Sequence, residues 1–178
     1  MQGPVNIEVE QGLLGTLLSD TSGMLWPQVS GLLKPDHFQE PLHARIFDAI
    51  ASLATAGKVA SAFTLQNAFA KDETLNELGG TGYLARLVAS AAPAISLKSH
   101  SELLRDLAAR RVAIEAATKL ITDADTVTID ETFRPTLAAH VEAMQALFDN
   151  GSTRKTTATL GEAASAMVER VHRIRNGN

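Results

Sequence analysis

Residues 96–123 contain no proline and no glycine, whereas the 95 residues before them contain both types at many positions. Both residue types interrupt helices, so the uninterrupted stretch predicts one helix, roughly 40 Å long at a rise of about 1.5 Å per residue. The interrupted part predicts several short helices. Alanine (28 residues) and leucine (22) are abundant and aromatic residues make up only 4% of the chain, which favours helices over strands. We therefore expect an all-α fold.

Local signals place the short helices in a small globular head, residues 1–95. Asn6 is a suitable N-cap for the first helix, and Pro41 fits the first turn of another. Gly57 is expected to end that helix as a C-cap, and Ser61 to begin the next one. A further helix is predicted over residues 81–89.

The long helix is expected to pair with a second helix that begins near Pro135, giving a long antiparallel helical hairpin over residues 96–149. Two helices bury only one face of each other, so the remaining apolar residues predict a further partner and hence oligomerisation. The residues expected on the subunit- or partner-binding faces of the hairpin are Leu104, Leu107, Ile114, Ile121, Leu137, Val141, Met144 and Phe148. Sequence does not divide them between contacts within the hairpin and contacts between subunits.

Residues 150–158 are rich in small and polar side chains and predict a flexible linker. A last helix is predicted over residues 159–178, beginning with the capping box Thr159–Glu162. Its narrow apolar seam, typical of a helix that docks onto another surface, contains Leu160, Met167, Val171 and Ile174.

Composition excludes several classes of function. The net charge of −4 argues against a basic nucleic-acid coat, and the absence of cysteine excludes disulfides and thiolate chemistry. No apolar run reaches the length of about 18 residues that a membrane span needs. These features predict a cytoplasmic protein without a membrane partner.

No motif for catalysis or for binding a metal or cofactor can be defended. The segment Gly151–Thr156 resembles part of a P-loop, but Arg154 stands where the second glycine is required. Gly79-Gly80 is better interpreted as a helix C-cap followed by a tight turn. His37 and His43 share no helical face, so satisfied polar roles are expected for both rather than metal ligation. By elimination, the chain is interpreted as a binding or assembly module and not as an enzyme.

Several segments, taken in order, resemble the N-terminal domain of DnaB-type replicative helicases. The matching positions are Asn6–Gly15, Leu33–Phe38, Pro41–Ile50, Leu78–Leu84 and Leu103–Asp106. Each segment is weak evidence by itself, but the ordered set is specific.

The resemblance implies that the head and hairpin form dimers that build the N-terminal collar of a hexameric ring, and that the collar recruits a DnaG-type primase. It also implies that the last helix packs on the RecA-like motor of a neighbouring subunit. ATP and Mg²⁺ belong to that motor, which this chain lacks, and DNA is contacted only through the full-length helicase. An alternative is a stand-alone helical adaptor or replication inhibitor that uses the collar surface.

Overall fold

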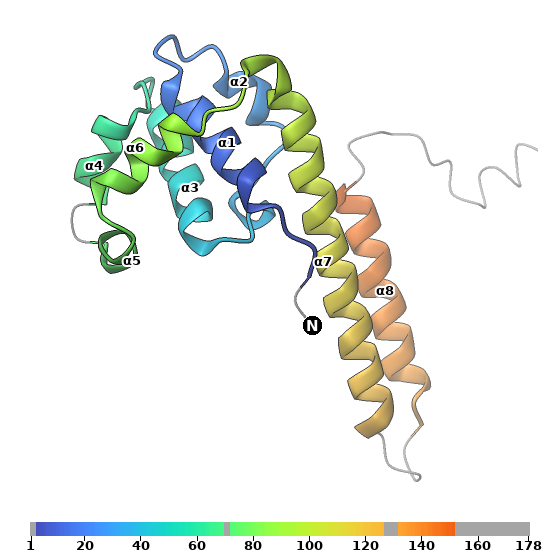
Figure 1. Cartoon of the computed structure of the whole chain (residues 1–178). Coiled ribbons are helices and arrows are strands. Elements are labelled where there is room, and N and C mark those ends of the chain that lie inside the picture. The colour runs from blue at the N-terminus through green and yellow to red at the C-terminus, as the bar shows by residue number, and fades with distance from the viewer. Residues whose placement is uncertain (1–2, 70–71, 127–131, 152–178) are drawn as a thin grey trace, which may run out of the picture. The chain divides into compact units, whose positions relative to one another are not determined.

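The computed structural model of the chain describes residues 3–69, 72–126 and 132–151, and every regular element in these ranges is a helix (Figure 1). The expected all-α class is confirmed. Two compact units divide the chain at residue 126. The first contains α1 (Ile7–Ser19), α2 (Trp26–Val29), η1 (Pro35–His37), α3 (Pro41–Thr55), α4 (Ala62–Ala68), α5 (Glu73–Glu77), α6 (Thr81–Ala89), η2 (Ala94–Ser96) and α7 (Leu97–Thr126). The second contains α8 (Arg134–Gly151).

The predicted helix starts are confirmed by their capping contacts. The side-chain oxygen of Asn6 accepts a hydrogen bond from the Val9 N–H at 3.1 Å, which satisfies a free amide in the first turn of α1. The Ser61 hydroxyl does the same for the Thr64 N–H at 3.2 Å in α4. Pro41 is the first residue of α3, where its missing N–H costs nothing.

The turn between α5 and α6 contains two glycines with positive φ, Gly79 at +98° and Gly80 at +61°. Their amides donate to the Asn76 and Leu75 carbonyl oxygens at 3.1 and 2.7 Å, and so satisfy the end of α5. The interpretation of Gly79-Gly80 as a helix C-cap and tight turn is therefore confirmed.

Helix α1 packs against α3, α6 and α7 (Figure 1). It approaches α6 so closely at Gly15 that an added Cβ atom would lie 1.9 Å from the Leu87 carbonyl oxygen. The neighbouring Thr16 hydroxyl shares its proton between the carbonyl oxygens of Gly12 and Ala92, at 2.7 and 2.8 Å. Gly15 thus permits the close approach of α1 to α6, and Thr16 connects α1 to the segment that follows α6.

The head core extends past residue 95 into α7. Leu97, Leu104, Leu107 and Ala108 of α7 are buried against the elements that precede them. From residue 109 to residue 126, α7 has no buried residue. Only the first half of the long helix therefore contributes to the core of the first unit.

Helix α8 begins at Arg134, beside the predicted start at Pro135. It ends at Gly151, so the first two residues of the predicted linker, 150 and 151, are helical. The rest of that linker and the predicted docking helix over residues 159–178 lie outside the described residues.

Candidate interaction surfaces

The structure places Leu104 and Leu107 differently from the prediction. Leu104 is completely buried and Leu107 is 8% exposed, and both belong to the head core. The reason is that α1, α2 and η1 pack against α7 and cover its first apolar turns. These two residues support the fold of the head and are not available to a partner.

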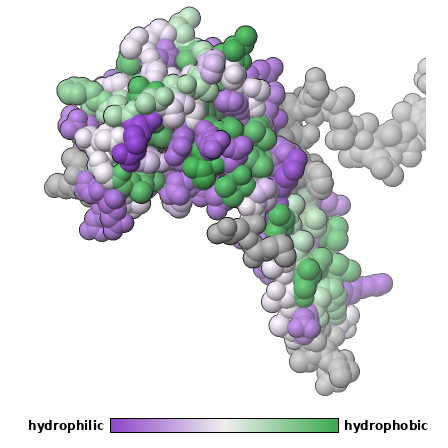
Figure 2. Space-filling view, viewed as in Figure 1, coloured by the Kyte–Doolittle hydropathy of each residue, from purple (hydrophilic) through white to green (hydrophobic). Residues whose placement is uncertain are grey.

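The predicted residues in the second half of α7 are accessible. Ile114 is half-buried and Ile121 is 69% exposed. Val112, which the sequence analysis did not select, is 39% exposed on the same part of the helix. Figure 2 shows that apolar side chains make up part of the surface of the described residues. Such exposed apolar side chains on one helix are a feature of interaction surfaces.

In the second unit, three predicted residues of α8 are exposed. Leu137, Val141 and Met144 follow one another at spacings of four and three, so they share one helical face. Phe148 also lies in α8, but its side chain is outside the described residues. The docking-helix residues Leu160, Met167, Val171 and Ile174 lie outside the described residues as well.

A buried polar network that the sequence analysis missed connects α1, α3 and α6. The completely buried Glu10 carboxylate lies 2.7 Å from Nδ1 of His43, and Nε2 of His43 lies 2.6 Å from the Tyr83 hydroxyl. The same carboxylate accepts hydrogen bonds from the backbone N–H groups of Gln39 and Glu40, at 2.7 and 3.3 Å, where α3 begins. A buried carboxylate is stabilised by such amides and by the positive end of a helix dipole.

The expected polar roles of the two histidines agree with this geometry. Both ring nitrogens of His43 have partners in the network. Nδ1 of His37 accepts a hydrogen bond from the Lys34 N–H at 3.2 Å. No group of three or more His, Asp or Glu residues within residues 3–69, 72–126 and 132–151 is arranged to hold a metal ion.

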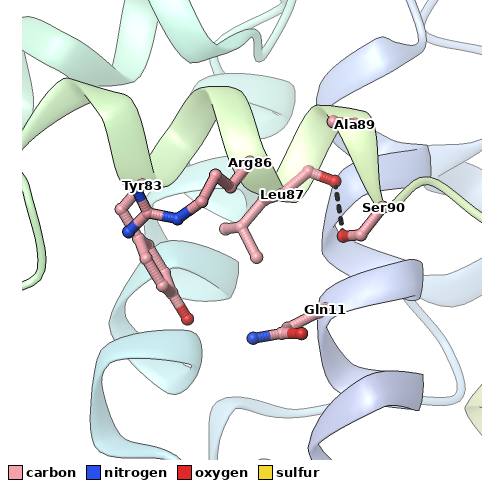
Figure 3. A pocket seen from close by; sticks show the side chains of 6 residues that line it. All are labelled: Gln11, Tyr83, Arg86, Leu87, Ala89 and Ser90. Atoms are coloured by element: carbon pink, nitrogen blue, oxygen red, sulfur yellow. Dashed lines mark hydrogen bonds between the residues drawn. The ribbon is translucent and has the colours of Figure 1, made fainter.

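The network resembles a catalytic relay in its order of carboxylate, imidazole and hydroxyl, but its role is to hold the helices together. Burial raises the pKa of the Tyr83 hydroxyl above its usual 10.0, although a hydrogen bond with Gln11 opposes this change. A raised pKa disfavours the phenolate that nucleophilic chemistry would need. Figure 3 shows the Tyr83 hydroxyl directed toward Gln11. Both residues line a hollow of about 370 Å³. The Arg86 guanidinium lies over the Tyr83 ring, 5.3 Å from its centroid. The network therefore fixes how three helices pack.

Among the helices that the structure describes, none combines the length and the apolar character that crossing a bilayer requires.

Within the described residues, the fold is all-helical, and exposed apolar side chains lie on α7 and on α8. The family model described as "DnaB-like helicase N terminal domain" matches residues 2–106. The chain belongs to this family.

The curated relatives are longer than this chain. The replicative DNA helicase DnaB of Rickettsia felis is 30% identical over 178 residues, which cover 98% of this chain and 35% of the relative. DnaB of Geobacillus stearothermophilus is 28% identical over 120 residues, covering 67% of this chain and 26% of the relative. The chain thus spans about a third of the length of the first of these.

Two solved structures share the fold. The N-terminal domain of DnaB helicase from Mycobacterium tuberculosis superposes with a TM-score of 0.68 at 26% identity, covering 84% of this chain and 99% of that domain. A DnaB-like replicative helicase, described together with its interactions with primase, gives a TM-score of 0.62 at 24% identity, over 97% of this chain and 38% of its own. The second likeness supports the fold alone.

Proposed function

We propose that this chain is the N-terminal collar domain of a replicative DNA helicase and that it joins subunits into a dimer or hexameric ring. The observation that carries the proposal is the exposure of apolar side chains on the second half of α7 and on α8, with Ile121 69% and Val141 48% exposed. Burying these side chains between copies removes apolar surface from water, which is the main driving force of association. Family membership supports the same function.

The proposal includes the partners of a helicase collar. We expect the hairpin surface to recruit a DnaG-type primase, and the docking helix, residues 159–178, to pack on the RecA-like motor of a neighbouring subunit. ATP and Mg²⁺ are assigned to that motor, and DNA is reached through the complete helicase. One structural neighbour is described with its interactions with primase, which makes a primase the first partner to test.

Self-association is tested by analytical ultracentrifugation of the 178-residue chain and of two variants, Ile121→Glu and Val141→Glu. Each variant places a charge where the proposal needs an apolar contact, and such burial of an unpaired charge is strongly unfavourable. We expect the parent chain to associate and both variants to be monomers. Phe63→Glu is the matched control, because Phe63 is 77% exposed but lies on α4. A parent chain that stays monomeric at millimolar concentration contradicts the proposal.

Primase recruitment is tested separately by calorimetric titration of a DnaG-type primase into the same three variants and the parent chain. Loss of binding in the α7 and α8 variants, with binding retained in Phe63→Glu, is the expected result. Equal binding by all four proteins would place the primase site elsewhere.

A further inference from the structure

One face of the second half of α7 is exposed at five successive positions. Val112, Glu115, Lys119, Thr122 and Thr126 follow one another at spacings of three and four, so they share one helical face. All five are exposed, and a hollow of about 640 Å³ borders Glu115, Lys119 and Thr122. The same spacing is found along the contact line of two paired helices. We refer to these five residues as the α7 seam.

The two charged residues of the seam differ in their partners. Lys119 forms an ion pair with Asp123 at 2.8 Å. Arg111, four positions before Glu115, donates instead to two backbone carbonyl oxygens, at 3.3 and 2.9 Å. Within the residues that the structure describes, Glu115 forms no ion pair, although a cation lies four positions away on either side. The Glu115 carboxylate is therefore available to a cation of another molecule.

A second copy of the seam supplies that cation when the two helices run in opposite directions. Antiparallel pairing about position 117 places Glu115 opposite Lys119 of the second copy and, by symmetry, Lys119 opposite Glu115. It also places Val112 opposite Thr122. The Thr122 hydroxyl donates to a carbonyl oxygen of its own helix at 3.0 Å, so its proton already has an acceptor in such a contact. Parallel pairing would instead bring identical charges together, which is unfavourable.

The extent of the head core gives the same register. Helix α7 has no buried residue over 109–126, a stretch whose midpoint lies between positions 117 and 118. Pairing about position 117 therefore overlaps the unburied halves of the two helices along their length. Ala108, the last buried residue of α7, then lies opposite Thr126, its last residue. The order of the charges and the extent of the core thus agree on one arrangement.

We propose that the α7 seam binds the α7 seam of a second copy in antiparallel orientation, with Glu115 and Lys119 of each copy forming two reciprocal ion pairs. The inference rests on the proposed assembly of this chain and specifies the orientation and register of one contact within it. Ile121 is two positions from Lys119 and so lies on another face of α7. An apolar contact at Ile121 and a contact through the seam are therefore compatible.

A partner with charges of one sign fits the seam less well. The Glu115 carboxylate repels an acidic segment or a nucleic-acid strand, and the Lys119 ammonium repels a basic segment. A partner that carries both signs in the reverse order satisfies both groups. A second copy in antiparallel orientation has this order.

The test measures self-association of the 178-residue chain by analytical ultracentrifugation at low ionic strength, after reversal of the seam charges. Glu115→Lys or Lys119→Glu alone is expected to weaken association at least about tenfold, because two like-charge contacts replace two ion pairs in each dimer. The combined Glu115→Lys/Lys119→Glu variant is expected to associate like the parent chain, since it restores both pairs in reverse order. An equimolar mixture of the two single variants should also associate, because each supplies the charges that the other lacks.

Lys98→Glu is the matched control. It makes the same change of charge as Lys119→Glu at an exposed residue of α7, but in the first half of the helix and outside the proposed contact. We expect it to associate like the parent chain. Circular dichroism of every variant checks that the helices are retained.

Three results would overturn the inference: unchanged association of the single variants, equal weakening by Lys98→Glu, or no recovery in the combined variant and the mixture. If the parent chain associates and one of these results is found, the register is wrong and the collar proposal stands. A parent chain that remains a monomer contradicts both.

Discussion

In the first half of α7, residues 97–108, Leu104 is completely buried and Leu107 is 8% exposed, whereas in the second half, residues 109–126, Ile121 is 69% exposed. Apolar residues recur at helical spacing through both halves, so periodicity alone does not distinguish them. What differs is the neighbourhood, because α1, α2 and η1 pack on α7 and no residue of α7 after Ala108 is buried. The comparison shows that one helix can serve the stability of a domain at one end and its interactions at the other.

Truncating one residue in each half of α7 tests this difference most directly. Leu104→Ala is expected to lower the free energy of unfolding by about 2–5 kcal/mol, because it leaves a cavity in the head core. Ile121→Ala is expected to change it by less than about 0.5 kcal/mol in the monomer, since little surface there is buried. Urea unfolding of both variants followed by circular dichroism measures the difference. Equal losses would mean that the two halves share one environment.

The same test can be made on the helix that supports the first half of α7. Gly15→Ala is expected to cost about 1–3 kcal/mol, because the new Cβ atom meets the Leu87 carbonyl oxygen and forces α1 and α6 apart. Gly31→Ala is the control, since nothing lies within 4 Å of a Cβ atom at that position. Thermal unfolding of the two variants provides the comparison. A stable Gly15→Ala protein would show that α1 can shift without loss.

Much of this architecture is predictable from local chemistry. Asn6, Pro41 and Ser61 mark helix starts because capping depends on residues within one turn. The burial of Leu104 was not predictable, because it depends on how far the head reaches along α7.

The Glu10–His43–Tyr83 network was also missed, since its members lie 33 and 40 residues apart in the sequence. One signal was available. Glu10 falls on the same face of α1 as the buried residues Leu13 and Leu17, at spacings of three and seven. An acidic residue on a core-facing stripe predicts a buried polar partner.

Polar groups are expected to show the same difference between buried and exposed positions. Tyr83→Phe removes the hydroxyl that lies 2.6 Å from His43 Nε2 and leaves that nitrogen in the core without its partner, at a cost of about 1–3 kcal/mol. Thr118→Val removes a hydroxyl from the exposed half of α7, where it donates a hydrogen bond to a carbonyl oxygen of the helix. Water can replace this hydrogen bond, so the change is expected to cost less than about 0.5 kcal/mol. Chemical unfolding of both variants measures the two costs. A neutral Tyr83→Phe change would show that the network does not hold the helices.

The smallest expected effect is a pH dependence of stability that arises at η1, which packs against α7. Burial lowers the pKa of His37 below 6.5, and Lys34, Arg105 and Arg111 lower it further, while Asp36 partly opposes them. The unfolded chain therefore binds a proton at His37 more readily than the folded chain. Its contribution to stability is complete above pH 6.5 and is lost as the pH falls from 6.5 through the lower folded-state pKa.

His37→Asn removes this titration and keeps an oxygen near the position of Nδ1 that can accept the Lys34 N–H. Between about pH 7.5 and pH 5, the parent chain is expected to lose more stability than His37→Asn does. Ile121→Ala is the control and should lose as much as the parent, because its exposed side chain in the second half of α7 does not titrate. Urea unfolding at both pH values measures the losses. Equal losses in all three proteins would show that protonation of His37 is not opposed by the fold, and that the cations around η1 lie too far from its ring to act on it.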